Sequence, residues 1–416
     1  MDTVQPSSAT ARLLGWLGAL AIATLVGLGL ASTLEVVRYQ PGSDEGYYLH
    51  YMEQVQQGGL GAFPAQFHFY LGEKRHWIFP PPSRVGFVAV SALWASVRGA
   101  SLRSLSELSL AAHLALILAT FAFASRWFGT AKGLLVTALV ACSTLALGLA
   151  RLALTDSVIT LTQFLALALF YEYVQAPQRR WRALAFGCAF TFAILTKEIA
   201  VLLALPCAMW AAVERRQRGR DLPIGRTVLL LTLPAVLAGL CWIVAAGSPF
   251  KLIKVLRIVL LSPATNDYAI RYGSGGWFRY PVDEILMSPW PTLLGLLGIG
   301  VALWRWRRGE YGALAVFLAL VYVSQVAMLG FFTKNLRYVA ILELPLRFLA
   351  VILLWEFLSA SRSRLGLAAC TLAVSGMCWL GWSDFRLFWI RHHVYDPVTK
   401  ELVGVRQMIP TTPAKD

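Results

Sequence analysis

Long apolar segments separated by short polar turns make up most of the chain. A helix of about 20 apolar residues crosses the roughly 30 Å hydrocarbon core of a bilayer, and it satisfies all its backbone hydrogen bonds there. The predicted membrane spans are 13–34, 107–127, 132–150, 157–174, 183–196, 199–213, 225–246, 287–304, 311–332, 336–358 and 364–383. This pattern predicts an all-α polytopic membrane protein with about eleven transmembrane helices.

The apolar run 85–97 is shorter than a membrane span. It lies in a long first connecting segment, 35–106, whose many aromatic residues suit the level of the lipid headgroups. We therefore expect interfacial helices in this segment, with 85–97 as an interfacial or re-entrant helix. Counting 85–97 as a full span would split the basic clusters of the later turns between the two sides of the membrane.

The composition supports a membrane protein and argues against nucleic-acid binding. Of the 416 residues, 57% are hydrophobic and 14% are charged, which leaves too little polar surface for a soluble domain of this length. The net charge of +15 is concentrated in short turns, as the positive-inside rule describes. All six cysteines lie within or at the edge of apolar segments, so we expect buried side chains and no disulfide framework.

The basic clusters fix a predicted orientation. With the N-terminus in the cytoplasm, alternating spans place all of them on the cytoplasmic side: Arg126 with Lys132, Arg179–Arg180 with Arg182, Arg215–Arg216 with Arg218 and Arg220, Arg305 with Arg307–Arg308, and Arg362 with Arg364. The transmembrane domain is predicted over 1–384. Its extracytoplasmic side carries the first segment, a second long segment at 247–286 and a short tail, 385–416. This predicts a multi-pass protein of the inner (plasma) membrane.

The first candidate for chemistry is the adjacent pair Asp44 and Glu45, just after the first span. Ionisable groups in such apolar surroundings usually mark a pathway or a catalytic site. Neighbours on a helix point about 100° apart, so one carboxylate can face a substrate while the other holds a cation or a lysine. The alternative is a solvated pair that favours the N-terminus of the following helix.

Three further charged elements fall on the predicted extracytoplasmic side. Arg151 and Asp156 flank the turn after span 132–150; alternatively, Arg151 anchors to headgroups and Asp156 caps the next helix. Lys197 and Glu198 lie between two short spans, where a lysine needs an anion. That anion is a substrate phosphate or, alternatively, Glu198 or Asp156 in a structural ion pair.

The last element is the turn Lys334–Tyr338, which contains Arg337. Basic residues on the extracytoplasmic side run against the positive-inside trend, so phosphate contact and headgroup anchoring are both open. We expect Asp44, Glu45, Arg151, Asp156, Lys197 and Arg337 to gather around one pocket. Such a mixture of carboxylates and cations suits a phosphate-bearing lipid substrate and a group transfer that needs a base.

These elements in this order resemble those of the GT-C glycosyltransferases, especially the protein O-mannosyltransferases and the lipid A aminoarabinose transferases. The matching residues, over 10–360, are Asp44-Glu45-Gly46-Tyr47, Arg151 with Asp156, Thr196-Lys197, and Arg337-Tyr338 with the downstream Pro345. This chain departs from the family at Glu198, where a small residue is usual, and at Tyr47 to Leu49, which offer no arginine after the acidic pair.

The resemblance implies a GT-C fold and an inverting transfer of a sugar from a polyprenyl-phosphate carrier to an acceptor glycan, lipid or protein. Asp44 or Glu45 is the implied base; we favour Asp44, with Glu45 orienting Lys197 or a cation. Arg151, Lys197 and Arg337 are implied to bind the donor phosphate.

The same resemblance gives Asp156, Glu198, Tyr47 and Tyr338 supporting or metal-binding roles. These oxygen-bearing side chains could bind Mg²⁺ or Mn²⁺ as a cofactor, but the sequence does not require a divalent cation. A secondary transporter or lipid-linked-sugar flippase is the main alternative, although the chain shows no internal repeat. A non-catalytic scaffold would leave the acidic pair unexplained.

Overall fold

The computed structural model describes residues 9–39, 43–219, 222–261, 266–310, 312–358 and 364–407. Outside these ranges lie Arg220 and Arg362 of the predicted basic clusters, the first residue of the predicted span 311–332, a short part of the second long segment (262–265) and the tail from 408 onward. The described residues form helices and no strand, as the sequence predicts.

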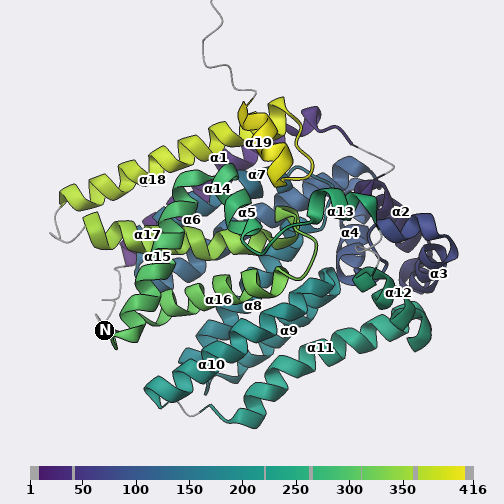
Figure 1. The fold of residues 1–416 in the computed structure, drawn as a ribbon, viewed down its shortest axis with the longest axis horizontal. Coiled ribbons are helices and arrows are strands. Elements are labelled where there is room, and N and C mark those ends of the chain that lie inside the picture. Colours follow the sequence, from purple (N-terminus) through teal and green to yellow (C-terminus); the bar gives the residue numbers. More distant parts are fainter. Residues whose placement is uncertain are drawn as a thin grey trace, which may run out of the picture.

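A bundle of long helices forms the body of the molecule (Figure 1). Its members are α1 (Ala9–Ala31), α5 (Leu102–Phe128), α6 (Thr130–Ala141), α7 (Thr144–Leu149), α8 (Asp156–Gln175), α9 (Arg180–Thr196), α10 (Ala204–Arg218), α11 (Ile224–Ala246), α15 (Pro289–Arg307), α16 (Ala313–Leu329), α17 (Glu343–Leu358) and α18 (Arg364–Phe385). Each predicted span thus corresponds to one helix or to two consecutive short ones.

Six helical stretches among the described residues are long and apolar enough to cross a membrane; α6 and α16 are apolar but shorter. The number eleven therefore stays a prediction. The helices of the bundle differ in how far they are buried. In the most apolar stretch of α8, 83% of the residues are buried, compared with 28% in α1 and 22% in α11. Because α1 and α11 expose rows of leucine and valine, their outer faces suit contact with lipid.

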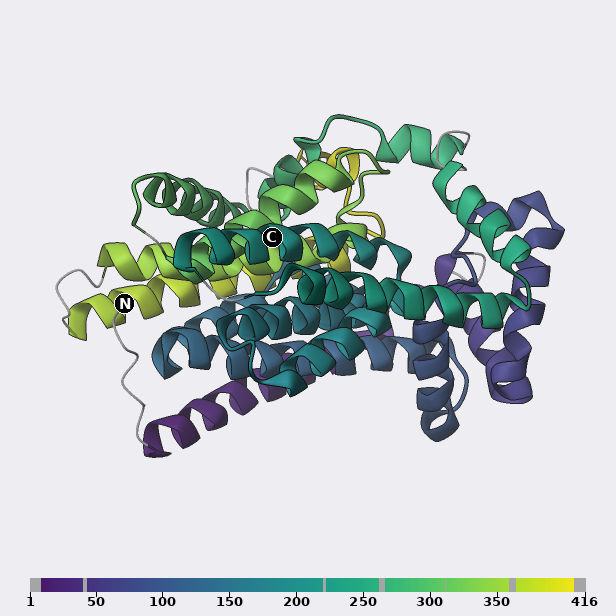
Figure 2. The ribbon, with the colours of Figure 1, turned by 90° about the horizontal axis from the view of Figure 1, so that it is seen from below.

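The two long connecting segments are helical and lie at one end of the bundle (Figure 2). The first contains α2 (Asp44–Gly58), α3 (Phe63–Gly72) and α4 (Val85–Arg98), and the second contains α12 (Pro249–Leu261), α13 (Asp267–Gly273) and α14 (Arg279–Met287). In Figure 2, α4 runs across the direction of the bundle helices. This course agrees with the prediction that 85–97 is not an ordinary span.

Two predicted spans are broken near the same end. In span 132–150, α6 ends at Ala141 and α7 begins at Thr144. The Ser143 hydroxyl caps α7 by accepting a hydrogen bond from the backbone N–H of Ala146 (3.4 Å). Span 336–358 begins as the 3₁₀ helix η6 (Leu336–Leu342), and α17 follows with Pro345 in its first turn, where a missing N–H costs nothing. Both breaks place irregular backbone beside the connecting segments.

Glycines allow the bundle helices to approach closely. A Cβ added to Gly295 of α15 would come within 2.6 Å of the Leu346 carbonyl oxygen of α17. Small residues at such contacts are typical of helix packing in membranes, where backbone proximity replaces the hydrophobic effect.

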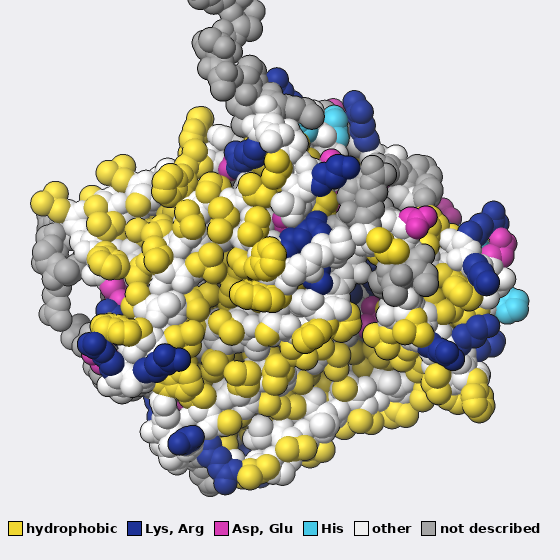
Figure 3. All heavy atoms as spheres, in the orientation of Figure 1, with side chains coloured by type: hydrophobic (Ala, Val, Ile, Leu, Met, Phe, Trp, Pro, Cys, Tyr) yellow, Lys and Arg dark blue, Asp and Glu magenta, His cyan; other side chains and the backbone are white. Residues whose placement is uncertain are grey.

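The end of the bundle where α1 begins carries the basic turns, whereas the opposite end carries the connecting helices and the described part of the tail. Figure 3 shows apolar side chains over much of one face, with Lys and Arg at its lower left, at its right edge and in its upper part. The tail contains the π-helical turn η7 (Arg386–Arg391) and α19 (Thr399–Gln407), and α19 packs against α14. The tail is therefore built into the end of the bundle that carries the site described next.

Candidate active site

A cavity of about 410 Å³ opens at the end of the bundle where the connecting segments and the tail meet. We call it the main cavity. Its wall comes from the start of α2, the segment before α4, α12, α13, the turn at Thr333, η6 and the tail. The lining residues with charged or aromatic side chains are Asp44, Tyr70, Trp77, Phe79, Arg84, Arg337, Tyr338, Tyr395 and Asp396.

Asp44 begins α2 and forms an ion pair across the cavity wall. Its Oδ2 lies 2.8 Å from Nη2 of Arg337, and its side chain is 25% exposed. The two residues are separated by most of the chain, so this pairing is purely tertiary. Asp44 is thus a carboxylate in the cavity that is accessible to a ligand.

Arg337 is the centre of the charge cluster. Besides Asp44, its guanidinium lies 3.4 Å from Oδ1 of Asp396 and 3.8 Å from Oδ2 of Asp156, and its side chain is only 4% exposed. Its plane also lies 4.7 Å from the ring centre of Tyr395. A buried arginine among three carboxylates is held in one orientation, because each contact uses a different edge of the planar fork.

Lys197 and Asp156 form a second buried pair. Lys197 Nζ donates to Oδ1 of Asp156 at 2.8 Å and lies 4.7 Å above the ring of Tyr338. Burial lowers the pKa of Lys197, while the nearby Asp156 carboxylate opposes this effect. Of the sequence alternatives for the partner of Lys197, the structure gives Asp156. Neither Lys197 nor Asp156 lines the main cavity; they lie directly behind Arg337 and Tyr338.

Arg84 supplies a second cation to the main cavity that the sequence analysis missed. Nε of Arg84 lies 3.6 Å from Oε2 of Glu198, and Nη1 donates to the Tyr48 hydroxyl. Glu198 also accepts a hydrogen bond from Ser83. Glu198, the residue at which this chain departs from the resembled family, therefore positions Arg84. The sequence pointed to this contact only through the unusual glutamate just after α9.

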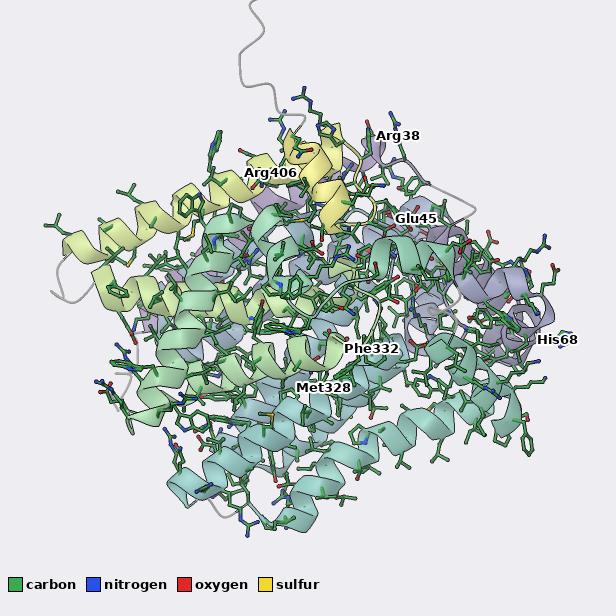
Figure 4. All side chains as sticks on the ribbon, in the orientation of Figure 1. Arg38, Glu45, His68, Met328, Phe332 and Arg406 are labelled. Atoms are coloured by element: carbon green, nitrogen blue, oxygen red, sulfur yellow. The ribbon has the colours of Figure 1, made fainter. Side chains whose placement is uncertain are left out.

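Glu45 has a backbone partner that the sequence analysis did not expect. Its side chain is fully buried and accepts a hydrogen bond from the Ala153 backbone N–H at 3.1 Å (Figure 4). Asp44 and Glu45 do point apart, as the helical period predicts. However, Glu45 faces the turn between α7 and α8, whereas the ammonium group of Lys197 is paired with Asp156; orientation of Lys197 or a cation by Glu45 stays a prediction.

Arg151 is also placed differently from the prediction. Its Nη1 donates to the Trp389 carbonyl (3.3 Å) and its Nη2 to the Thr33 carbonyl (2.5 Å), and the residue is 3% exposed. It lies outside the lining of the main cavity, where Arg84 occupies the expected position of a second arginine. Of the six charges expected around one pocket, Asp44 and Arg337 line the main cavity, and Asp156 and Lys197 are linked to Arg337 by ion pairs behind its wall.

The two tyrosines of the prediction have separate environments. Tyr47 stacks on Phe79, with ring centres 4.2 Å apart, and so supports a lining residue from behind. Tyr338 lines the cavity itself. Trp77, Tyr70 and Tyr395 add aromatic surface around it, which suits the apolar face of a sugar ring.

The carboxylates of the cluster are arranged around Arg337 and not around a common ligand position. Asp44, Asp156 and Asp396 each lie within 4 Å of its guanidinium. Among the described residues, no group of three or more His, Cys, Asp or Glu side chains has an arrangement that could hold a metal ion. The donor set therefore does not fit Mg²⁺ or Mn²⁺ while Arg337 keeps these contacts.

Asp396 is, after Arg84, a second functional candidate that the sequence analysis did not consider. Its Oδ1 accepts a hydrogen bond from Asn335 Nδ2 (2.6 Å) and forms the ion pair with Arg337. It lies in the tail, in a polar stretch without a helical or apolar pattern. Only the docking of the tail brings it to the cavity.

Comparisons with known proteins agree with this architecture. The model of the dolichyl-phosphate-mannose-protein mannosyltransferase family matches residues 85–242. The oligosaccharyltransferase AglB of Archaeoglobus fulgidus superposes with a TM-score of 0.57 at 11% identity, over 96% of this chain and 60% of that one. ArnT of Cupriavidus metallidurans gives a TM-score of 0.54 at 16% identity, over 91% and 77% of the two chains.

The chain has the GT-C fold. The likeness to AglB and ArnT extends over nearly the whole chain, although the chain spans only about 60% of the length of AglB. The matched residues begin at the start of α4, directly after Arg84, and end within α11; they include Asp156 and Lys197. The comparison with curated proteins finds no match.

Proposed function

We propose that the protein is an inverting glycosyltransferase that moves a sugar from a polyprenyl-phosphate carrier to an acceptor at the extracytoplasmic side of the inner (plasma) membrane. The observation that carries the proposal is the partly exposed Asp44, opposite Arg84 and Arg337, in one large cavity with aromatic walls. AglB has been solved with a dolichol-phosphate, and ArnT with undecaprenyl phosphate, so the fold accommodates such lipids. No feature of the site favours a transporter.

In this proposal the donor phosphate binds to Arg84 and Arg337. The phosphate competes with Asp44 for the Nη groups of Arg337, and this frees the Asp44 carboxylate to accept the proton of the acceptor hydroxyl or amine. The acceptor atom attacks the anomeric carbon, and the bond from that carbon to the phosphate oxygen breaks. The electron pair stays on the polyprenyl phosphate, where the two arginines stabilise the charge.

Lys197, Asp156 and Glu198 act as positioning residues in this mechanism. Lys197 holds Asp156, which in turn faces Nε of Arg337, while Glu198 faces Arg84. Their charges lie behind the phosphate-binding arginines and keep each guanidinium in place.

The decisive experiment compares the unaltered protein with Asp44→Asn in lipid nanodiscs, using polyprenyl-phosphate-linked sugars and extracted envelope acceptors. We expect glycosylated acceptor and released polyprenyl phosphate in equal amounts, and a loss of about 10²–10⁴-fold in rate for Asp44→Asn. Glu73→Gln is the control, because Glu73 is an exposed carboxylate in the same connecting segment. Full turnover by Asp44→Asn would remove Asp44 as the base, and uptake of the donor without transfer would favour a flippase.

We further propose that transfer does not depend on a divalent cation, because Arg337 already contacts the carboxylate oxygens at which such an ion would bind. The rate should be the same after treatment with a chelator and after re-addition of Mg²⁺ or Mn²⁺. Loss of activity that either ion restores would show that a cation displaces Arg337 during the reaction.

A further inference from the structure

A second cavity, of about 240 Å³, lies beside the main one. We call it the side cavity. It is lined by Val37, Arg38, Arg151, Leu152, Trp389, His393, Val394 and Tyr395. Tyr395 lines both cavities and therefore separates them. The walls come from three distant parts of the chain: the segment after α1, the turn before α8 and the tail.

The side cavity is rich in hydrogen-bond donors and cationic side chains. Nε of Arg151 and Nε1 of Trp389 are both buried, and neither has a hydrogen-bond partner among the described residues. Arg38 and His393 add two more nitrogen-bearing side chains, and no described carboxylate lines the cavity. Buried donors without acceptors are costly, so this arrangement calls for an acceptor that the protein does not itself supply.

Arg151 is fixed in place before any ligand arrives. Its two Nη atoms donate to the carbonyls of Thr33 and Trp389, and its guanidinium lies 5.7 Å from the ring centre of Phe385. Burial lowers the pKa of Arg151 to about 10, while the nearby Tyr39 opposes this effect. A bound anion would supply the missing charge.

We propose that the side cavity binds one oxyanion, a phosphate-class group, between Arg151, Trp389, Arg38 and His393. Arg38 is exposed and lies at the same end of the bundle as Glu45 (Figure 4), so the cavity can be reached from solvent or from the headgroup layer. The group comes either from an anionic lipid headgroup or from a free phosphate-bearing molecule. Both sources share the chemistry that the donors recognise.

An anion bound in the side cavity would also affect the main cavity, because the same stretch of the tail forms part of both walls. His393 has a left-handed backbone conformation (φ 49°), and the turn that it makes leads directly to Tyr395 and Asp396. Tyr395 covers Arg337, and Asp396 pairs with it. An anion held by His393 and Arg151 therefore stabilises the wall that positions Arg337. This second step rests on the proposed function, whereas binding of the anion does not.

The test measures thermal unfolding and direct binding with the full-length protein in detergent. The probes are inorganic phosphate, at constant ionic strength set with chloride, and short-chain phosphatidylglycerol. Ligands that bind only the folded state raise the midpoint of unfolding. The variants are Arg38→Gln, which alters an exposed side chain, and His393→Asn, because asparagine tolerates left-handed backbone. Arg75→Gln is the matched control, since Arg75 is an exposed arginine outside both cavities.

Besides any phosphate bound by Arg84 and Arg337 in the main cavity, we expect one oxyanion per chain in the side cavity. The affinity of this second site should be at least tenfold weaker in Arg38→Gln and His393→Asn and unchanged in Arg75→Gln. Binding of phosphatidylglycerol alone would identify a headgroup as the source, and binding of both probes would identify a general phosphate site. Binding that is absent in the unaltered protein, or equal in Arg38→Gln and Arg75→Gln, would overturn the proposal. A protein that binds phosphate at this cavity but transfers no sugar would disprove the proposed function alone.

Discussion

At the scale of single residues, Arg337 shows how one buried side chain organises a site. Asp44, Asp156 and Asp396 come from the first connecting segment, the start of α8 and the tail, and all face its guanidinium. Without Arg337, each of these carboxylates would lose an ion pair, and Asp156 would keep the one with Lys197. Removing one partner from a buried ionic cluster is costly, because the remaining charges keep their desolvation penalty.

The substitution Arg337→Lys tests this arrangement. A lysine keeps the charge but cannot contact three carboxylates and a phosphate with one compact ammonium group. We expect a folded protein whose KM for the donor rises by about 10–100-fold, which corresponds to the loss of one charge-assisted hydrogen bond. Steady-state kinetics with varied donor would measure it, with Arg75→Lys as the control. An unchanged donor KM would contradict phosphate contact by Arg337.

At the scale of elements, the docking of the tail decides the shape of the main cavity. α19 is joined to α14 by Thr399, which donates to Asp283, and by Arg406, whose guanidinium donates to the Leu286 carbonyl at 3.0 Å. Gly148 of α7 provides the space for Trp389 on the other side, since a Cβ there would approach its ring to 2.0 Å. The position of Tyr395 and Asp396 follows from these contacts.

The contact between α14 and α19 should weaken as the pH rises. Burial raises the pKa of Asp283 to about 6, while Thr399 and Arg279 oppose the effect. The unfolded value is about 4, so the folded state binds more protons between pH 4 and 6, and stability falls by about 1–3 kcal/mol across this window as the pH increases. Hydrogen exchange of 399–407, corrected for its intrinsic pH dependence, should show faster opening at pH 7 than at pH 5.

The variant Asp283→Asn provides the control for that pH dependence. It removes the titrating group and keeps an oxygen that can accept the hydrogen bond of Thr399. We expect exchange in α19 to become nearly independent of pH over the same window. An unchanged pH profile in Asp283→Asn would assign the effect to another group.

At the scale of the whole molecule, the ends of α10 and α17 and the starts of α11 and α18 lie at the opposite end of the bundle from α2, α12 and α13, which border the candidate site (Figure 1). The proposed orientation places the site outside the cytoplasm. We expect Ala100→Cys, next to α4, to react with a membrane-impermeant thiol reagent in intact cells. Gln217→Cys, in the basic last turn of α10, should react only after permeabilisation. Both positions are exposed, and the native cysteines would first be replaced. The reverse labelling pattern would invert the proposed orientation.

The sequence by itself determined the elements and much of the candidate chemistry. Apolar runs specify helices in a membrane whatever their neighbours are, so the predicted spans recur as helices, and the GT-C fold was expected from four short motifs. The helical period also predicted that Asp44 and Glu45 diverge. These properties depend on a few consecutive residues, and a local pattern is enough to read them.

Only the tertiary structure decided which charges share a cavity. The Arg151 guanidinium donates to two backbone carbonyls, and the Glu45 carboxylate accepts from a backbone N–H. Arg84 and Asp396 line the main cavity although no sequence motif marks them. The breaks within spans 132–150 and 336–358 also depend on neighbouring elements. The physical reason is that a buried charge takes whichever partner the packing places within reach, and that partner lies far away along the chain.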